Sequence, residues 1–222
     1  MRSFNASGKS SVQMIARADE RKRFQEALLR SAPDYQIALN GNTQERLSRY
    51  FLLLNKWNER LHLIAPCSAE EFATRHVLES LTITHHLPPN SSVADIGSGG
   101  GLPLIPCLIA REDLRGYLIE ASGKKAVFLR EALKTTDTEK QASVLNNRFE
   151  KLSTPTVNFV TCRALEHFQE RLPEIIEWSP HQCTFLLFGG DKLAARLDQL
   201  GLTYNKELLP NSERRFLFMV AK

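Results

Sequence analysis

The sequence has few cysteines and no long apolar run. Its four cysteines, at positions 67, 107, 162 and 183, form no Cys-x-x-Cys pair, and its six histidines lack metal-ligand spacing with them. We therefore expect reduced thiols and no bound metal. No apolar run approaches the ~18 residues that span a membrane. The first 18 residues lack the apolar stretch of a secretory signal, so we expect a cytoplasmic protein with no membrane partner.

Two common nucleotide-binding motifs are incomplete. A dinucleotide fingerprint G-x-G-x-x-G that starts at Gly97 needs a third glycine at position 102, which is Leu102. A phosphate-binding loop G-x-x-x-x-G-K-[ST] that ends at Gly8-Lys9-Ser10 has Ser3 in place of its first glycine, and no strand precedes it. These departures argue against a dinucleotide site and against a phosphate-binding loop.

The glycines that are present gather in one stretch. Four of the eleven lie between the apolar residues Val93–Ile96 and Pro103. The pattern D-x-G-x-G-x-G from Asp95 to Gly101 is similar to the loop with which class I methyltransferases hold S-adenosylmethionine. Gly97, Gly99 and Gly101 allow positive φ and let a ligand approach main-chain N–H groups. A plain strand-to-helix turn needs fewer glycines, so we favour a ligand loop.

Strand and helix patterns alternate from residue 91 onward, which is typical of a parallel sheet covered on both faces. The predicted helices are 102–111, 124–134, 165–178 and 192–200. The predicted strands are 93–96, 116–120, 143–145, 157–162 and 183–188, with an antiparallel closing pair at 204–209 and 215–220. The pattern predicts an α/β fold of the class I methyltransferase type, Rossmann-like, with a mostly parallel, doubly wound sheet.

The part of the chain before this alternation has no strand pattern. We expect a flexible basic tail over residues 1–18, a helical layer packed on the core over 19–90, and a methyltransferase domain over 91–222. Residues 1–30 hold seven Lys and Arg against three Asp and Glu, an excess that equals the net charge of +4 of the whole chain. This charge fits a polyanionic partner such as RNA, or a solvated helix end, about equally well.

Three polar residues mark the expected starts of helices. Asn42 with Glu45 has the spacing of a capping box before an amphipathic helix. Ser68 with Glu71 has the same spacing before a second helix, and Ser122 precedes the helix that follows the second strand.

In doubly wound sheets a ligand lies at the carboxyl ends of the strands, so residues at those ends are the candidates. Glu120 ends the second strand, where its carboxylate can accept hydrogen bonds from ribose hydroxyls. Phe149 and Glu150 follow the third strand and could face an adenine ring or form a plain turn. Arg163 follows the fourth strand and could pair with a cofactor carboxylate, a substrate phosphate or a surface acid. Asp95 could meet the ammonium of the methionyl group or brace the glycine turn.

The sequence predicts no catalytic base or nucleophile. The Asn-Pro-Pro-aromatic tetrad of amino-group methyltransferases is absent after the fourth strand, where the chain reads Thr161-Cys162-Arg163-Ala164. Cys162 could be the thiolate of an RNA cytosine-C5 methyltransferase, although a small buried cysteine is the simpler interpretation. Ring N7 of guanine has a free lone pair, so its methylation needs positioning and no proton removal. We therefore favour a ring-nitrogen acceptor.

Several segments together resemble a known family. They are Trp57-Asn58, Arg75-His76-Val77-Leu78-Glu79-Ser80-Leu81, Asp95 to Pro103 with Ile105-Pro106, Lys124-Lys125 before Phe128-Leu129, Asn147-Arg148-Phe149-Glu150, and Arg163-Ala164. From about residue 42 to 222 the chain resembles the bacterial 16S ribosomal RNA guanine-N7 methyltransferase family once called glucose-inhibited division protein B. The Arg-His to Glu-Ser-Leu helix ahead of the loop is more diagnostic than the loop itself.

The resemblance implies S-adenosylmethionine as cofactor, with contacts at Gly97, Leu102, Phe149-Glu150 and Arg163. It implies a guanine near the decoding region of 16S rRNA as acceptor, on free RNA or on the small ribosomal subunit, and we expect a monomer. A module that keeps the fold and binds RNA or the ribosome without catalysis is the remaining alternative.

We expect RNA contacts from basic residues close to the matching segments, namely Arg75, Lys124, Lys125 and Arg163. The chain departs from the family at His62, where Asn-Leu-Thr is usual, at Leu104, where the family has glycine, and at Phe188, where it has lysine. These departures bear on RNA positioning more than on cofactor binding.

Overall fold

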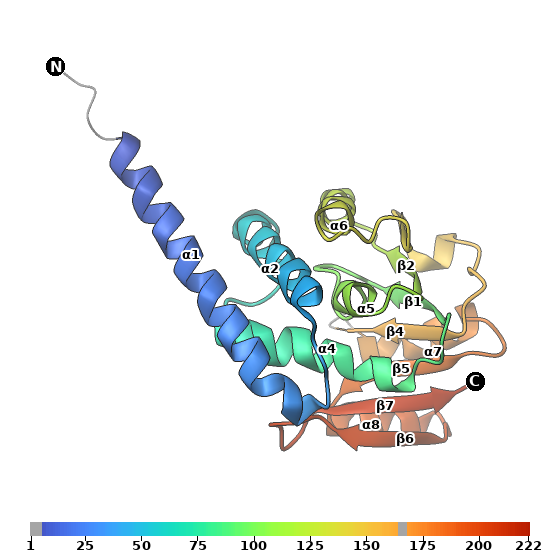
Figure 1. Ribbon diagram of the computed structural model, residues 1–222. Coiled ribbons are helices and arrows are strands. Elements are labelled where there is room, and N and C mark those ends of the chain that lie inside the picture. Colours follow the sequence, from blue (N-terminus) through green and yellow to red (C-terminus); the bar gives the residue numbers. More distant parts are fainter. Residues whose placement is uncertain (1–5, 164–167) are drawn as a thin grey trace.

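The computed structural model describes residues 6–163 and 168–222, which form a seven-stranded sheet between layers of helices (Figure 1). The strand order is β3-β2-β1-β4-β5-β7-β6, in which β7 runs antiparallel to β5 and β6 while the other pairs are parallel. The strands are β1 (Ser92–Ile96), β2 (Arg115–Ile119), β3 (Ala142–Leu145), β4 (Phe159–Cys162), β5 (Thr184–Gly189), β6 (Tyr204–Leu208) and β7 (Phe216–Ala221). The sheet confirms the predicted fold, and each strand starts and ends within two residues of its predicted bounds.

Helices cover both faces of the sheet. On one face lie α5 (Leu104–Ala110) and α6 (Gly123–Thr135), whose apolar side chains share a core cluster with the N-terminal helices. On the other face α7 (Phe168–Trp178) and α8 (Asp191–Gln199) pack in a second cluster with the 3₁₀ turn η4 (Phe149–Lys151). Alternate residues of β1 therefore enter different clusters, as the two-residue period of a strand requires. Among the described residues, no helix combines the length and apolar composition of a membrane span.

The N-terminal helices form a layer over α5 and α6. Their bounds are α1 (Ala6–Ser31), η1 (Ala32–Tyr35), α2 (Gly41–Leu61), α3 (Ala69–Glu71), the π-helical segment η2 (Phe72–Leu78), α4 (Glu79–Leu81) and η3 (Thr82–His86). The buried ring of Phe72 lies 6.0 Å from that of Phe24, 6.1 Å from that of Tyr50 and 5.2 Å from that of Phe51. These aromatic contacts join α1, α2 and η2 into one layer, and each ring contributes about 1.5–3 kcal/mol by its burial.

The starts of two helices differ from the predictions. The tail was predicted to reach residue 18, but α1 begins at Ala6, and its N-terminal part extends away from the rest of the molecule (Figure 1). Helix α2 is capped by Asn40 and not by Asn42, because Asn40 has the extended backbone of a cap and its side chain accepts from Thr43 N at 2.8 Å. The predicted caps Ser68 and Ser122 are confirmed.

The sheet creates a crevice at its centre. Strand β1 lies between β2 and β4, so the connections that leave β1 and β4 cross to opposite faces of the sheet. The register pairs Ile96 with Ile119 and Asp95 with Thr161, which brings the carboxyl ends of the three strands to one level. The residues that follow these ends, Gly97 and Glu120 among them, therefore meet at the crevice.

Candidate active site

A cavity of about 500 Å³ lies at the carboxyl ends of β1 and β2. One wall is the main chain of Gly97–Gly100, and a second is segment 63–65, which connects α2 to α3. The side chains of His76, Glu120 and Arg163 also line it. The volume suits a small organic ligand, since such pockets usually measure about 300–1,000 Å³.

A second hollow of about 500 Å³ adjoins the first. Both are lined by Gly97 and Ala121, and the second continues past Asn147 to Phe149 and Glu150. The two hollows thus follow the sheet edge from β4 across β1 and β2 to the turn after β3. An elongated ligand can lie along this edge.

The glycine loop is held by the carboxylate of Glu120. Gly97 and Gly99 have φ of +71° and +50°, a backbone region that favours glycine. The N–H of Gly99 donates to Glu120 Oε2 at 2.9 Å, and the N–H of Ser122 donates to Oε1 at 2.7 Å. Glu120 is 8% exposed and lines the cavity, as its position in the sequence predicts. Each oxygen keeps a lone pair for a ligand hydroxyl, so its contact with a ribose stays a prediction.

Gly101 and Leu102 lie between the glycine loop and α5. A Cβ on Gly101 would lie 2.4 Å from Ile105 Cδ1, so this glycine is required for close packing on α5. The sequence interpretation gave Gly101 the same role as Gly97 and Gly99, whereas the structure gives it a steric reason within the fold. Leu102 is 7% exposed and lines the cavity without filling it.

Asp95 is a buried acid at the end of β1. Its side chain is fully buried, and neither carboxylate oxygen has a hydrogen-bond partner among the described residues. Burial, with a smaller contribution from the nearby charge of Glu120, raises the pKa of Asp95 to about 8. With this pKa the Asp95 side chain is mostly protonated at pH 7, and it is not among the described lining residues of either hollow. A cationic group that reached it would favour the ionised form. The turn is braced by Glu120 and by Tyr50, whose hydroxyl donates to Gly100 O.

Phe149 and Glu150 form the far end of the second hollow. Phe149 is 3% exposed, and its ring lies 5.6 Å from the ring of Trp178 in an edge-on contact. The guanidinium of Arg171 lies 4.7 Å from the centroid of the same ring and also pairs with Glu150. The N–H groups of Phe149 and Glu150 begin a 3₁₀ turn and need no partner within it. This end of the site offers an apolar edge and main-chain donors.

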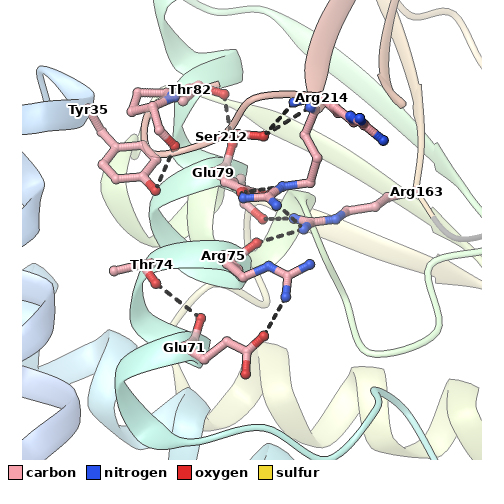
Figure 2. Close-up of polar contacts among 12 residues, drawn as sticks. Tyr35, Glu71, Thr74, Arg75, Glu79, Thr82, Arg163, Ser212 and Arg214 are labelled. Carbon is pink, nitrogen blue, oxygen red and sulfur yellow. Dashed lines mark hydrogen bonds and ion pairs between the residues drawn. The ribbon is translucent and has the colours of Figure 1, made fainter. Parts of the chain in front are cut away.

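Arg163 is held on the opposite side by a buried ion cluster, shown in Figure 2. Glu79 is 1% exposed and accepts from Arg163 Nη2 at 3.2 Å and from Arg215 Nη2 at 2.7 Å. Arg163 also donates to Arg75 O at 2.7 Å and to Ser80 Oγ at 3.2 Å. The guanidinium is thereby oriented by the N-terminal layer, which is more specific than the surface ion pair considered from the sequence.

Residues that the sequence interpretation left without a role complete this wall. Glu79 and Arg215 fix Arg163, and His76 lines the cavity beside it. Phe188, one of the family departures, lies under Arg163 with its ring centroid 5.1 Å from the guanidinium carbon. Glu79 lies in the Arg75–Leu81 segment of the family resemblance, and it is an acidic residue on the apolar side of a helix, between Val77-Leu78 and Leu81.

The predicted RNA contacts lie around the cavity. Lys125 lines it, Lys124 is exposed at the start of α6, and half of the Arg75 side chain is exposed although it pairs with Glu71. Their contact with RNA stays a prediction. Salt bridges pair three basic side chains of α1 with acids: Arg21 with Glu45, Lys22 with Glu26 and Arg23 with Asp19.

Cys162 is buried in the core. Its side chain is 1% exposed and belongs to the cluster under α7 and α8 together with Ile96 and Phe185. A thiolate that attacks a base must reach the acceptor, so this position argues against Cys162 as a nucleophile. The motif residue Ala164 lies outside the described residues. Among those described, no cluster of three metal-binding side chains occurs.

Known structures share this architecture. A crystal structure of a SAM-dependent methyltransferase from Aquifex aeolicus superimposes with a TM-score of 0.51, at 15% sequence identity, over 64% of this chain and 88% of that one. A strand order with β1 at the switch point, a glycine loop after β1 and an acid after β2 are the features of a class I methyltransferase fold.

Sequence comparison then gives the family. The family model described as "rRNA small subunit methyltransferase G" matches residues 43–209, so the chain belongs to that family. Curated relatives include the Ribosomal RNA small subunit methyltransferase G of Neisseria meningitidis, 34% identical over 65% of this chain and 68% of the relative. The protein of the same name from Xanthomonas axonopodis is 38% identical over 61% of this chain and 68% of the relative.

Proposed function

We propose that this protein transfers a methyl group from S-adenosylmethionine to N7 of a guanine in 16S rRNA of the small ribosomal subunit. Membership of the family gives the coarser activity, methylation of small-subunit rRNA. The observation that carries the proposal is the cavity between the Gly97–Gly100 main chain and Arg163, with Glu120 and the unpartnered Asp95 at the strand ends. The ribosomal substrate implies a cytoplasmic enzyme, and the protein acts as a monomer.

The residues present suit the cofactor chemically. The apolar edge and main-chain donors at Phe149 and Glu150 would hold the adenine, and Glu120 would accept from the ribose. The buried Asp95 carboxylate has no partner among the described residues and would pair with the methionyl ammonium, while Arg163 would face the carboxylate. When bound, the cofactor supplies a methyl group on a sulfonium.

The chain's own contribution is to position the acceptor. N7 of guanine carries a free lone pair, so methyl transfer requires no general base and no covalent intermediate. The side chains on the described cavity lining include no cysteine, and Glu120 is occupied by two main-chain N–H groups. A well-oriented pair of reactants that is shielded from water gains several kcal/mol of barrier reduction from proximity alone.

Methyl transfer to ribosomal RNA tests the proposal. Small ribosomal subunits that lack the modification are incubated with the protein and labelled S-adenosylmethionine, and the label is mapped by nuclease digestion and mass spectrometry. We expect 7-methylguanosine at one position of 16S rRNA. Label on cytosine C5 would instead support the Cys162 mechanism. Cofactor binding without any transfer to free RNA or to subunits would support a non-catalytic binding module.

A further inference from the structure

His76 is a polar side chain of the cavity to which the proposed cofactor contacts give no role. It lies on η2, and its ring centroid is 5.4 Å from that of Phe72. It lines the same hollow as Arg163 and segment 63–65. Among the residues that the structure describes, no hydrogen bond reaches either ring nitrogen of His76.

The wall that carries His76 lies away from the adenosyl end. Phe149 and Glu150, which would hold the adenine, line the second hollow, whereas His76 and segment 63–65 line the first. A cofactor along the strand ends leaves this wall to the second substrate. The wall is apolar at Leu63 to Ala65 and has one free imidazole, which suits a flat base with a polar edge.

The backbone at His76 is itself unusual. Helix residues 72–78 are π-helical, a form that is rare and that appears most often at functional sites. Phe72, Val77 and Leu78 are buried in the layer, while His76 keeps partial exposure in the cavity. The wider turn therefore combines a buried apolar face with one polar residue presented to the cavity.

The protonation state of His76 limits what it can contact. Burial, reinforced by the charges of Arg163 and Arg75, lowers the pKa of His76 to about 4. The ring is thus neutral near pH 7, with one N–H donor and one nitrogen acceptor. A neutral donor is suited to a carbonyl oxygen of a base, while the neighbouring arginines provide the charge for phosphate groups.

We propose that His76 determines base specificity by donating a hydrogen bond from its ring to O6 of the acceptor guanine. This inference rests on the proposed guanine-N7 activity. Guanine presents N7 and O6 side by side as acceptors, whereas adenine presents an amino donor where guanine has O6. In the tautomer whose N–H faces the base, His76 therefore pairs with O6 of guanine and opposes the amino group of adenine.

A double-substitution cycle tests the contact. His76→Phe keeps the ring size and removes both nitrogens, and 2-aminopurine at the mapped acceptor position keeps N7 and removes O6. On guanine RNA we expect His76→Phe to lower kcat/KM about tenfold, the effect of one lost hydrogen bond. The wild type should lose a similar factor on 2-aminopurine RNA. The two changes combined should cost no more than either alone, because both remove the same contact.

Three measurements make the result decisive. S-adenosylhomocysteine affinity by calorimetry should be unchanged in His76→Phe, and His76→Asn, which keeps a donor, should recover part of the lost activity. The matched control His86→Phe, a histidine that pairs with Glu207 outside the cavity, should behave as wild type. Additive losses in the cycle, or weaker binding of S-adenosylhomocysteine, would overturn the role of His76 while leaving guanine-N7 transfer intact. Wild-type label at an atom other than N7 would overturn the proposed function, and the inference with it.

Discussion

At the scale of single residues, Asp95 has the most unfavourable surroundings in the site. Burial raises its pKa to about 8, while an aspartate in an unfolded chain titrates near pH 4. Between those values the folded protein holds a proton that the unfolded chain has released. Stability linked to Asp95 is therefore greatest below about pH 4, falls as pH rises, and stays low above about pH 8.

Asp95→Asn should remove that part of the pH dependence. The amide has the size of the carboxyl and does not ionise, so the fall in Tm from pH 5 to pH 8 should be smaller in the variant. Thermal unfolding at half-unit pH steps measures it, with a difference of about 2–4 °C expected for each kcal/mol. Parallel Tm profiles for the two proteins would contradict the assignment.

Substitution of Gly99 tests whether a ligand contacts the main chain of the glycine loop. Gly99→Val places a β-branched residue at φ +50°, where the strain costs about 1–2 kcal/mol, and adds bulk against the cavity. We expect S-adenosylhomocysteine affinity to fall at least tenfold in calorimetry.

Gly201→Val is the matched control for Gly99→Val. Gly201 has φ +67° after α8 and no atom within 4 Å of an added Cβ, so its substitution carries the strain without the ligand loop. It should lower stability similarly and leave ligand affinity unchanged. Equal affinity losses in the two variants would attribute the effect of Gly99→Val to strain alone.

Some site residues could be predicted from their spacing in the sequence, and others could not. Gly97, Gly99 and Glu120 were predictable because a glycine loop and the next strand end have a fixed separation in this fold. The cluster of Glu79, Arg163 and Arg215 was not predictable, because Glu79 and Arg215 are 136 positions apart and only the folded chain brings them together. Asn42 has the capping-box spacing with Glu45, but the backbone conformation makes Asn40 the cap, and that conformation is not visible in the sequence.

At the scale of elements, Glu79 links three parts of the fold. It joins α4 to the residue after β4 through Arg163, and to the segment before β7 through Arg215. Substitution of one member of a buried ion cluster leaves an uncompensated charge, which typically costs about 3–5 kcal/mol. The cluster therefore stabilises the packing and also orients Arg163.

Arg215→Met tests whether the ion cluster stabilises the protein beyond the effect of removing one surface charge. It leaves Glu79 with Arg163 as its remaining arginine partner, so urea unfolding should show a loss of about 1–3 kcal/mol. Arg214→Met, at an exposed neighbouring position, changes the same net charge and should be within about 0.5 kcal/mol of wild type. Similar unfolding midpoints for the two variants would show that the cluster adds no net stability.

Elements with a strong pattern were predictable, and elements set by tertiary contacts were not. The β strands followed from short apolar runs bounded by turn residues. The π-helical turn over Phe72–Leu78 has no local signal, and its first residue, Phe72, packs among three aromatic rings that are distant in the sequence. Helix α1 extends to Ala6 although residues 1–18 have few apolar residues to support a prediction.

At the scale of the whole molecule, the N-terminal layer is part of the site. It supplies segment 63–65 and His76 to the cavity and anchors Arg163 through Arg75 and Glu79. The division into a tail, a helical layer and a methyltransferase domain stays a prediction. One apolar cluster runs from α1 and α2 through α5 and α6, so the helical layer shares its core with the sheet domain.

Phe72→Ala should therefore affect both stability and binding. Loss of a fully buried aromatic ring costs about 3–5 kcal/mol, and loosening of the layer should weaken S-adenosylhomocysteine binding as well. Urea unfolding and calorimetry measure the two effects. Val127→Ala, at a position that is 51% exposed on α6, is the control and should change neither quantity noticeably. Full ligand affinity in a destabilised Phe72→Ala protein would show that the layer is independent of the site.

A crystal structure of the protein with S-adenosylhomocysteine tests the central claim most directly. The ligand should lie along both hollows, with its adenine at Phe149 and Glu150, its ribose at Glu120 and its amino acid end towards Asp95 and Arg163. The Gly97–Gly100 main chain should contact it. Ligand density elsewhere on the molecule, or a ligand in the crevice with Glu120 and Asp95 out of contact, would contradict the account.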